Sequence, residues 1–381
     1  MRLLLVDDEP RILSGLSRAL RSSGSRDWDV AIATSGEEAL ARLAEVPTDV
    51  VLSDVNMPGM DGPALLGEVR RRWPDMVRLV LSGYADTAAS NRLASVAHQF
   101  FDKPLRISDL VEVLRRIERL RERFSNPGLR ALLGAVAELP ATPAIYTELS
   151  SVVEDPAATL DDIAQVVRRD PAVTAKVLQL ASSAFYNRGG PIADLRGAIG
   201  RVGGRVVRMV ALAAAAFRPP PKVAAIVDRI SMHSLEAAVL AEQIVGDPDQ
   251  REAAFVAALL ADLGMTALVT WMPERYLPFL TERGAPIHVR EAEAFGVTHA
   301  EVGAYLLGLW GLPRVVVEAV SCHHDPMAIG EPARDATLAA YVSHALLAHE
   351  PVDELYLARA GCSDRLARWE AMAASGCRTA P

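Results

Sequence analysis

The sequence has very few of the cysteines that build disulfide frameworks or thiolate metal sites. Its only cysteines are Cys322, Cys362 and Cys377. Three cysteines confined to the last part of a chain of 381 residues do not make a disulfide scaffold or a zinc site of thiolates. We therefore expect reduced thiols.

Positive charge is also in short supply. The 40 Lys and Arg residues are outnumbered by 48 Asp and Glu residues, which gives a formal net charge of -8 and a pI near 5.6. Such a chain lacks the overall basic surface that binds nucleic acid, and it has no recognisable helix-turn-helix. We expect proteins or small molecules as partners. Lysine occurs only at Lys103, Lys176 and Lys222, so the lysine at position 103 is not explained by the general composition of the surface.

Long hydrophobic runs are missing as well. The longest strongly apolar, helix-like run is Met209–Phe217, far short of the ~20 residues that cross a bilayer, and the N-terminus begins on a strand-like segment without a signal peptide. We therefore expect a cytoplasmic protein without a membrane association. Half of the residues are apolar, which is enough to bury the cores of two or three domains.

Four apolar stretches in the first third of the chain predict buried strands. Each is apolar at consecutive positions, as in strands that are covered on both faces. They are Leu3–Val6, Val50–Ser53, Val77–Leu81 and His98–Asp102. Amphipathic helices are predicted to begin near Pro10, Gly36, Gly62, Asp86 and Ile107. This alternation predicts an α/β fold with a doubly wound parallel sheet of flavodoxin-like size.

Polar residues follow these strands at their carboxyl ends: Asp7, Asp8, Asp54, Ser82 and Lys103. Ligands of an open parallel sheet bind beyond those ends. Three facing carboxylates would need a cation, and oxygen ligands suit Mg²⁺. Asp54 could then attack a phosphoryl group while Lys103 neutralises its oxygens and Ser82 donates a hydrogen bond. Any one acidic residue at a strand end often only caps the next helix, but that explanation does not cover the ends of four strands at once.

These residues resemble the receiver (CheY-like) domain of two-component response regulators over residues 1–122. The motifs that carry the resemblance are Leu-Leu-Val-Asp7-Asp8-Glu9-Pro, Leu-Ser-Asp54-Val-Asn-Met57-Pro58-Gly59-Met60-Asp61-Gly62, Val-Leu-Ser82-Gly and Phe-Phe-Asp-Lys103-Pro104.

The resemblance implies a role for each residue of this pocket. Asp54 would accept a phosphoryl group from a sensor histidine kinase. Asp7, Asp8, Asp54 and the backbone carbonyl of Asn56 would hold Mg²⁺. Ser82 and Phe100 would form the switch pair, since a new phosphoryl group attracts the hydroxyl and opens a space into which the ring turns.

A helix over the residues after Ile107 leads out of this domain. The break at Ser125–Gly128 ends that helix and marks a domain boundary, and we expect residues 123–130 to be a helical linker between the two domains. An apolar stripe of Ile117, Leu120 and Phe124 is compatible with a solvated helix and with a connector that packs against its own copy in a homodimer.

From residue 131 to residue 381 the strand signals largely disappear, and helical periodicity predicts an all-α domain. Seven of the eight histidines lie after residue 230. Histidines and aspartates on facing helices build metal sites in all-α proteins. The candidates are His233, Asp262, His299, His323 and His324. A histidine with an ordinary structural role is the commoner outcome.

This region is similar to HDOD domains, relatives of the HD-type metal-dependent phosphohydrolases, with a core at about residues 139–346. The motifs are Leu139-Pro140-Ala-Thr-Pro143, the segment 164–186, Ala198-Ile-Gly-Arg-Val-Gly203-Gly204 and the segment 299–313. In HD enzymes a His-Asp doublet binds the metal, whereas here Ala261 precedes Asp262. Met265 replaces the lysine of cyclic-dinucleotide hydrolases, and no Gly-Tyr-Pro follows His324.

The resemblance therefore implies an output domain that is not an enzyme. Losing one imidazole from a metal site costs a ligand and its orienting partners. We expect this domain to signal by binding a downstream protein and assign it no cofactor, although a residual metal or nucleotide site is left open. The alternative is a regulated metal-dependent phosphohydrolase or cyclic-dinucleotide phosphodiesterase with a degenerate HD site.

Overall fold

The computed structural model describes residues 1–22, 28–82, 96–123, 148–149, 151–153, 155, 157–182, 192, 194–204, 206–207, 219, 221–281, 284–329 and 336–375. The chain divides into two compact units, one essentially Met1–Glu138 and the other most of the rest. Four segments discussed above lie wholly or mostly outside the described residues: the predicted helix near Asp86, most of the linker 123–130, the motif Leu139–Pro143 and the run Met209–Phe217.

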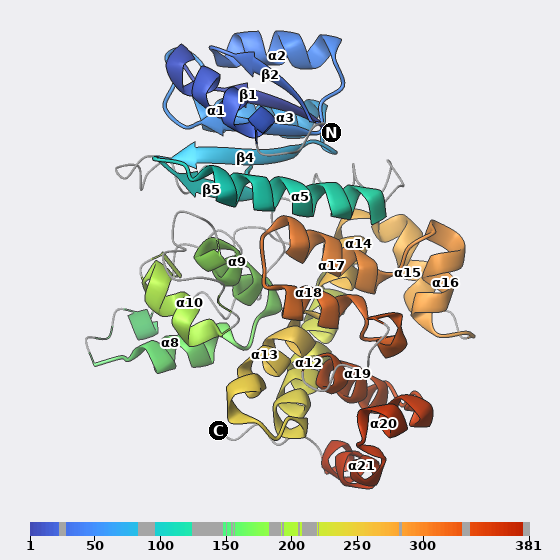
Figure 1. The fold of residues 1–381 in the computed structure, drawn as a ribbon. Coiled ribbons are helices and arrows are strands. Elements are labelled where there is room, and N and C mark those ends of the chain that lie inside the picture. The colour runs from blue at the N-terminus through green and yellow to red at the C-terminus, as the bar shows by residue number, and fades with distance from the viewer. Residues whose placement is uncertain are drawn as a thin grey trace. The chain divides into compact units, whose positions relative to one another are not determined.

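The first unit is built on a five-stranded parallel sheet in the order β2-β1-β3-β4-β5 (Figure 1). Its strands are β1 Arg2–Val6, β2 Asp29–Ala33, β3 Val50–Asp54, β4 Val77–Ser82 and β5 Gln99–Asp102. The direction of winding reverses between β1 and β3, which places the ligand crevice of this fold beside those two strands. The predicted flavodoxin-like sheet is thereby confirmed.

Helices cover this sheet where the sequence predicts them. They are α1 Pro10–Ser22, α2 Gly36–Glu45, α3 Gly62–Arg72 and α5 Ile107–Arg123. Helix α1 packs against α5, and α2 packs against α3. The Ser35 and Asp61 side chains accept hydrogen bonds from the first turns of α2 and α3, so local capping fixes where these helices begin.

Helix α5 is held on its own domain nearly to its end. The Arg121 guanidinium forms ion pairs with Asp49 at 2.9 Å and Asp75 at 3.1 Å. Ile117 has no exposed surface, so it is not available to a second copy of the chain. The side chain of Leu120 and all of Phe124 lie outside the described residues, so the predicted dimer stripe has no described surface to support it.

The regular elements in the described residues of the second unit are all helices. Its α-helices are α8 Leu160–Val167, α9 Pro171–Ser182, α10 Leu195–Val202, α12 Pro221–Ile244, α13 Pro248–Leu260, α14 Leu263–Trp271, α15 Pro273–Thr281, α16 Ile287–Phe295, α17 His299–Leu309, α18 Arg314–Ser321, α19 Ala336–Leu347, α20 Glu354–Ala360 and α21 Leu366–Ala374. Short 3₁₀ helices cover Pro326–Ile329 and Ser363–Arg365. The predicted all-α class is confirmed.

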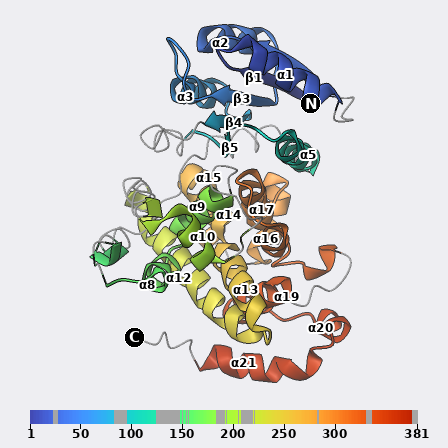
Figure 2. The ribbon, with the colours of Figure 1, turned by 60° about the vertical axis from the view of Figure 1, so that its left-hand side comes forward.

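The core of this unit is a bundle in which α12, α13 and α19 pack side by side, with α18 against α13 and α19 (Figures 1 and 2). Cys322 and Cys362 are both buried in this unit, and the expectation of reduced thiols stays a prediction. Cys377 lies outside the described residues.

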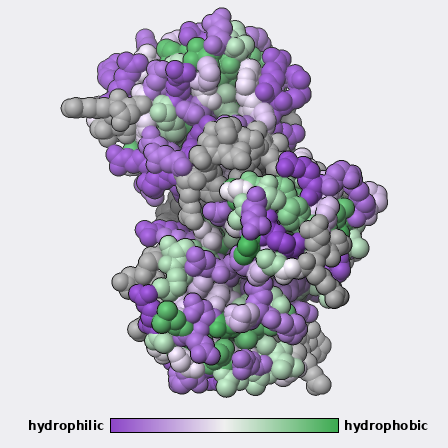
Figure 3. Space-filling model, turned by 90° about the vertical axis from the view of Figure 1, so that its right-hand side faces the viewer, coloured by the Kyte–Doolittle hydropathy of each residue, from purple (hydrophilic) through white to green (hydrophobic). Residues whose placement is uncertain are grey.

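The sequence estimate of the longest apolar run is wrong. Within the described residues, Gln250–Trp271, a stretch of 22 residues, is long and apolar enough to cross a bilayer, but 94% of its most apolar window is buried. It consists of α13 and α14, separated by the turn at Ala261 and Asp262. Figure 3 shows mostly hydrophilic side chains on the face in view, with green patches between them. The stretch is therefore part of the bundle core.

Candidate functional site

The carboxyl ends of β1 and β3 bring the predicted acidic residues together. Carboxylate oxygens of Asp7, Asp8 and Asp54 all lie within 4.8 Å of one another. Asp7 and Asp54 are buried, whereas Asp8 is exposed. The Lys103 ammonium nitrogen lies 2.9 Å from Asp7 Oδ2 and 2.7 Å from Asp54 Oδ1. The Lys103 ammonium thus bridges two buried carboxylates.

Burial and charge act in opposite directions on these groups. Burial raises the pKa of the Asp54 carboxyl, and the Lys103 ammonium lowers it by less. Burial by itself would lower the pKa of Lys103, but its contacts with Asp54 and Asp7 outweigh that effect and raise it. Lys103 therefore stays charged, and the pair of carboxylates keeps its compensating cation.

The loop after β3 closes tightly on Asp54. The backbone N–H of Gly62 donates to the carbonyl of Val55 at 2.9 Å, and a Cβ at position 62 would lie 2.2 Å from the Asp54 carbonyl oxygen. Only glycine fits there. Asn56 lies on this loop and is exposed, and the predicted role of its carbonyl stays a prediction.

Strand register brings the remaining predicted positions to the same edge of the sheet. Asp54 pairs with Leu81, and Ser82 pairs with Asp102 just before Lys103. The side chains of Ser82 and Phe100 lie outside the described residues. The switch pair therefore stays a prediction. The bond between Lys103 and Pro104 is cis.

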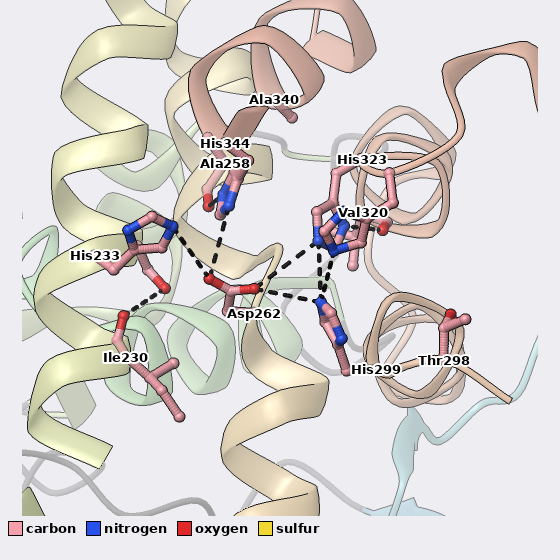
Figure 4. A network of polar contacts seen from close by, with 12 residues as sticks. Ile230, His233, Ala258, Asp262, Thr298, His299, Val320, His323, Ala340 and His344 are labelled. Carbon is pink, nitrogen blue, oxygen red and sulfur yellow. Dashed lines mark hydrogen bonds and ion pairs between the residues drawn. The ribbon is translucent and has the colours of Figure 1, made fainter. Parts of the chain in front are cut away.

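The second unit gathers its histidines around one carboxylate (Figure 4). Asp262 lies in the turn between α13 and α14. Its Oδ1 lies 3.5 Å from His299 Nε2 and 3.9 Å from His323 Nε2. Its Oδ2 lies 3.7 Å from His344 Nδ1 and 4.0 Å from His233 Nε2. The five residues come from three different helices and two turns, so only the tertiary fold assembles them.

The fifth candidate, His324, sits at the outer side of this cluster. Its Nε2 lies 3.0 Å from His299 Nε2, and its ring stacks on that of His288 with centroids 4.2 Å apart. Three groups of possible metal ligands follow from these positions within the described residues: His299, His323 and His324; His233, Asp262 and His344; and His288, His324 and Glu350.

A close helix crossing allows the approach of His299 to Asp262. Gly264 lies in the first turn of α14 against the start of α17, and a Cβ at position 264 would lie 2.0 Å from the His299 carbonyl oxygen. A side chain there would separate the two helix ends. The small residue thus sets the distance between the turn that carries Asp262 and the helix that carries His299.

The protonation of the cluster is uneven. Burial would lower the pKa of His299, but Glu291 outweighs it and raises that pKa. Burial lowers the pKa of His323, His324 and His344. The charge of Asp262 is therefore met by imidazoles of which most prefer to be neutral.

Sequence reasoning found His233, Asp262, His299, His323 and His324, and the structure places them together. It missed others. His344 contacts Asp262 from α19, and buried Glu291 accepts hydrogen bonds from Tyr276 and His299. The available signal was a polar residue inside an apolar helix, since His344 lies in a segment whose neighbours are nearly all apolar.

The chain matches two family models. The response regulator receiver domain matches residues 3–115, and the HDOD domain matches residues 139–326. The acidic pocket lies wholly within the first match. Asp262, His299 and the histidine pair lie within the second, and His344 lies beyond its end.

Curated relatives share parts of the chain. It is 31% identical over 196 residues to the hydrogenase transcriptional regulatory protein HoxA of Cupriavidus necator, covering 47% of this chain and 39% of HoxA. It is 34% identical over 135 residues to the transcriptional regulatory protein TrcR of Mycobacterium tuberculosis, covering 35% and 51%. It is 41% identical over 117 residues to the sensor kinase CckA of Brucella abortus, covering 30% and 12%. The chain thus spans about half, or less, of the length of these relatives.

Two solved structures each match more than half of this chain. The response regulator MmoQ from Methylococcus capsulatus has 28% identity and a TM-score of 0.49, covering 61% of this chain and 98% of MmoQ. A virulence factor from Campylobacter jejuni has 22% identity and a TM-score of 0.50, covering 64% and 92%. The second likeness concerns the fold alone.

Proposed function

The chain is a response regulator with a receiver domain followed by an HDOD domain, and we propose that Asp54 is its phosphoacceptor. The observation that carries the proposal is the pocket of Asp7, Asp8 and Asp54, with the Lys103 ammonium within 2.9 Å of two of its carboxylates. Receiver domains generally use Mg²⁺, and their partners include sensor kinases.

The chemistry follows from the charges of this pocket. A carboxylate oxygen of Asp54 attacks phosphorus, an O–P bond forms, and the bond to the donor nitrogen of the kinase histidine breaks. Lys103 lies where its ammonium can leave Asp54 and neutralise a phosphoryl oxygen. Mg²⁺, held by Asp7, Asp8, Asp54 and the Asn56 carbonyl, would neutralise the rest of the charge when bound.

The receiver covers residues 1–122 in this proposal, and 123–130 link it to an HDOD output over 131–381. Phosphorylation moves Ser82 and Phe100 and so changes the affinity of the output for a downstream protein. The ion pairs of Arg121 with Asp49 and Asp75 support a receiver that includes nearly all of α5. The net charge of -8 supports a protein partner over nucleic acid, and the proposed compartment is the cytoplasm.

The HDOD domain binds rather than hydrolyses in this proposal. A response regulator with an HDOD output fits a role without catalysis. Ala261, which is fully buried, offers no ligand beside Asp262, and a missing imidazole weakens a catalytic metal site.

Phosphorylation of the full chain by a small-molecule phosphodonor in the presence of Mg²⁺ tests the acceptor. The variant Asp54→Asn removes the nucleophile and should abolish the added phosphoryl mass. The same change at Asp29, an exposed carboxylate at the start of β2, is the matched control and should label like the wild type. Labelling of Asp54→Asn at the wild-type level would remove Asp54 as the acceptor.

A further inference from the structure

Three histidines of the Asp262 cluster have an outer ring nitrogen bound to a group that only accepts. His344 Nε2 lies 3.1 Å from the Ala258 carbonyl oxygen, and His323 Nδ1 lies 2.7 Å from the Val320 carbonyl oxygen. His299 Nδ1 lies 2.7 Å from Glu291 Oε2. A carbonyl or carboxylate oxygen cannot donate, so each of these nitrogens carries the hydrogen.

The inner nitrogens are fixed by the same contacts. In its neutral form each of these imidazoles has a single N–H, which the outer nitrogen carries, so in that form the inner nitrogen presents a lone pair. These are His344 Nδ1, His323 Nε2 and His299 Nε2, and all three point toward the Asp262 carboxylate (Figure 4). His299 Nε2 also lies 3.3 Å from His323 Nε2. Lone pairs thus face lone pairs across distances of 3.3 to 3.9 Å.

Protons alone compensate this arrangement poorly. A proton on every inner nitrogen would place several imidazolium rings side by side, and the centroids of His299 and His344 each lie within 5.3 Å of that of His323. Asp262, His299 and His323 are also almost completely buried, where like charges repel strongly. A divalent cation between the carboxylate and the inner nitrogens would satisfy all of these lone pairs at once.

We propose that Asp262 is the bridging ligand of a divalent transition-metal centre in the HDOD domain, in which His344 supplies a nitrogen ligand that position 261 lacks. One position lies between Asp262 Oδ2, His344 and His233. The other lies between Asp262 Oδ1, His299 and His323. Imidazole nitrogens with one carboxylate suit zinc, iron(II) or manganese(II) rather than calcium or magnesium.

The partners of the outer nitrogens support this assignment. Metal-binding histidines commonly donate their second N–H to a carboxylate or a backbone carbonyl, which fixes the tautomer and the direction of the ring. Glu291 is fully buried and is itself held by the Tyr276 hydroxyl. The backbone N–H of His299 donates to the same Glu291 Oε2 at 2.8 Å. Glu291 therefore positions His299.

A metal there would join helices that are distant in sequence. The ligands come from α12, the turn after α13, α17, the turn after α18, and α19. His233 is 33% exposed at its side chain, which gives an ion a route from solvent. The proposal goes beyond phosphoryl acceptance, because it concerns the output domain and requires no hydrolysis.

Metal content of the untagged full chain tests the proposal. Comparison with Asp262→Ala, which leaves Asp7, Asp8 and Asp54 unchanged, subtracts any ion that the receiver pocket holds. Protein reconstituted with Zn²⁺, Mn²⁺ or Fe²⁺ under anaerobic conditions is desalted and analysed by mass spectrometry of its metals, and a Co²⁺-loaded sample is examined for the visible bands of nitrogen-bound cobalt.

We expect near-stoichiometric metal in this protein and a loss of at least about 10-fold in affinity for His344→Ala. His349→Ala changes an exposed histidine of the loop after α19 and should retain the metal. His233→Ala, at a partly exposed position, gives a second test if His344→Ala does not fold by circular dichroism. Metal content no higher than that of Asp262→Ala, or equal binding by His344→Ala and His349→Ala, would overturn the proposal.

Discussion

Replacing Lys103 by methionine tests how the acidic pocket compensates its charge. The substitution keeps the length of the side chain and removes the ammonium that lies 2.7 Å from Asp54 and 2.9 Å from Asp7. Asp7 is only 1% exposed, so water cannot fully replace the lost cation. Without Mg²⁺, the folded receiver of the variant must hold two uncompensated carboxylates.

The magnitude follows from these contacts. At an effective dielectric constant of about 20, each contact corresponds to roughly 6 kcal/mol of gross Coulomb energy. Desolvation cancels most of it, and hydrogen bonds to charged groups contribute about 1.5–3 kcal/mol net. Because the Lys103 side chain is 29% exposed, we expect a loss of about 2–4 kcal/mol, which lowers the Tm of the receiver by roughly 10 °C.

Mg²⁺ should restore much of this stability, since the metal and the ammonium compensate the same carboxylates. Calorimetry of the full chain with and without Mg²⁺, together with hydrogen exchange of peptides from β1 and β3, measures the effect. Lys222→Met removes an exposed ion pair with Glu274 in the other unit and should leave both strands unchanged. An equal Mg²⁺-dependent gain in Lys103→Met and in the wild type would refute the reasoning.

Two further predictions concern the helical domain. Gly264→Ala places a Cβ 2.0 Å from the His299 carbonyl oxygen and should lower the free energy of unfolding by about 3 kcal/mol or more. Thermal unfolding measures this loss, and Gly246→Ala, whose added Cβ would have nothing within 4 Å, is the control. Equal Tm values for the two variants would contradict the tight contact between α14 and α17. Glu291→Gln replaces an accepting carboxylate oxygen by an amide N–H that faces the donors of Tyr276 or His299. Metal affinity, measured by competition with a chelator, should fall about 10- to 100-fold. An unchanged affinity would remove Glu291 as a positioning residue.

The receiver was readable from the sequence because its pattern is local. Consecutive apolar residues predict buried strands, and residues directly after such strands must share one edge of a parallel sheet. Asp7, Asp8, Asp54 and Lys103 could therefore be placed together before any coordinates were known. The side chains of Ser82 and Phe100 lie outside the described residues, so their coupling stays a prediction.

The helical domain was only partly readable. The sequence indicated Asp262, His233, His299, His323 and His324 as candidates. The helical periodicity does not show which helix faces pack against one another. Ala261 indicated a degraded site. His344 stands out as a polar residue in an apolar helix, but the sequence does not show that it approaches the same carboxylate as His233 and His299.

The sequence by itself determined the fold class of both domains and the acidic pocket, because strand ends and helix periods depend on neighbours along the chain. Only the tertiary structure decided which nitrogen of each histidine faces Asp262. That choice depends on hydrogen-bond partners such as the Ala258 and Val320 carbonyls. Every residue has a backbone carbonyl, so the sequence does not show which carbonyl accepts from a histidine. The packing of separate helices therefore decides whether those imidazole nitrogens are oriented to bind a metal ion.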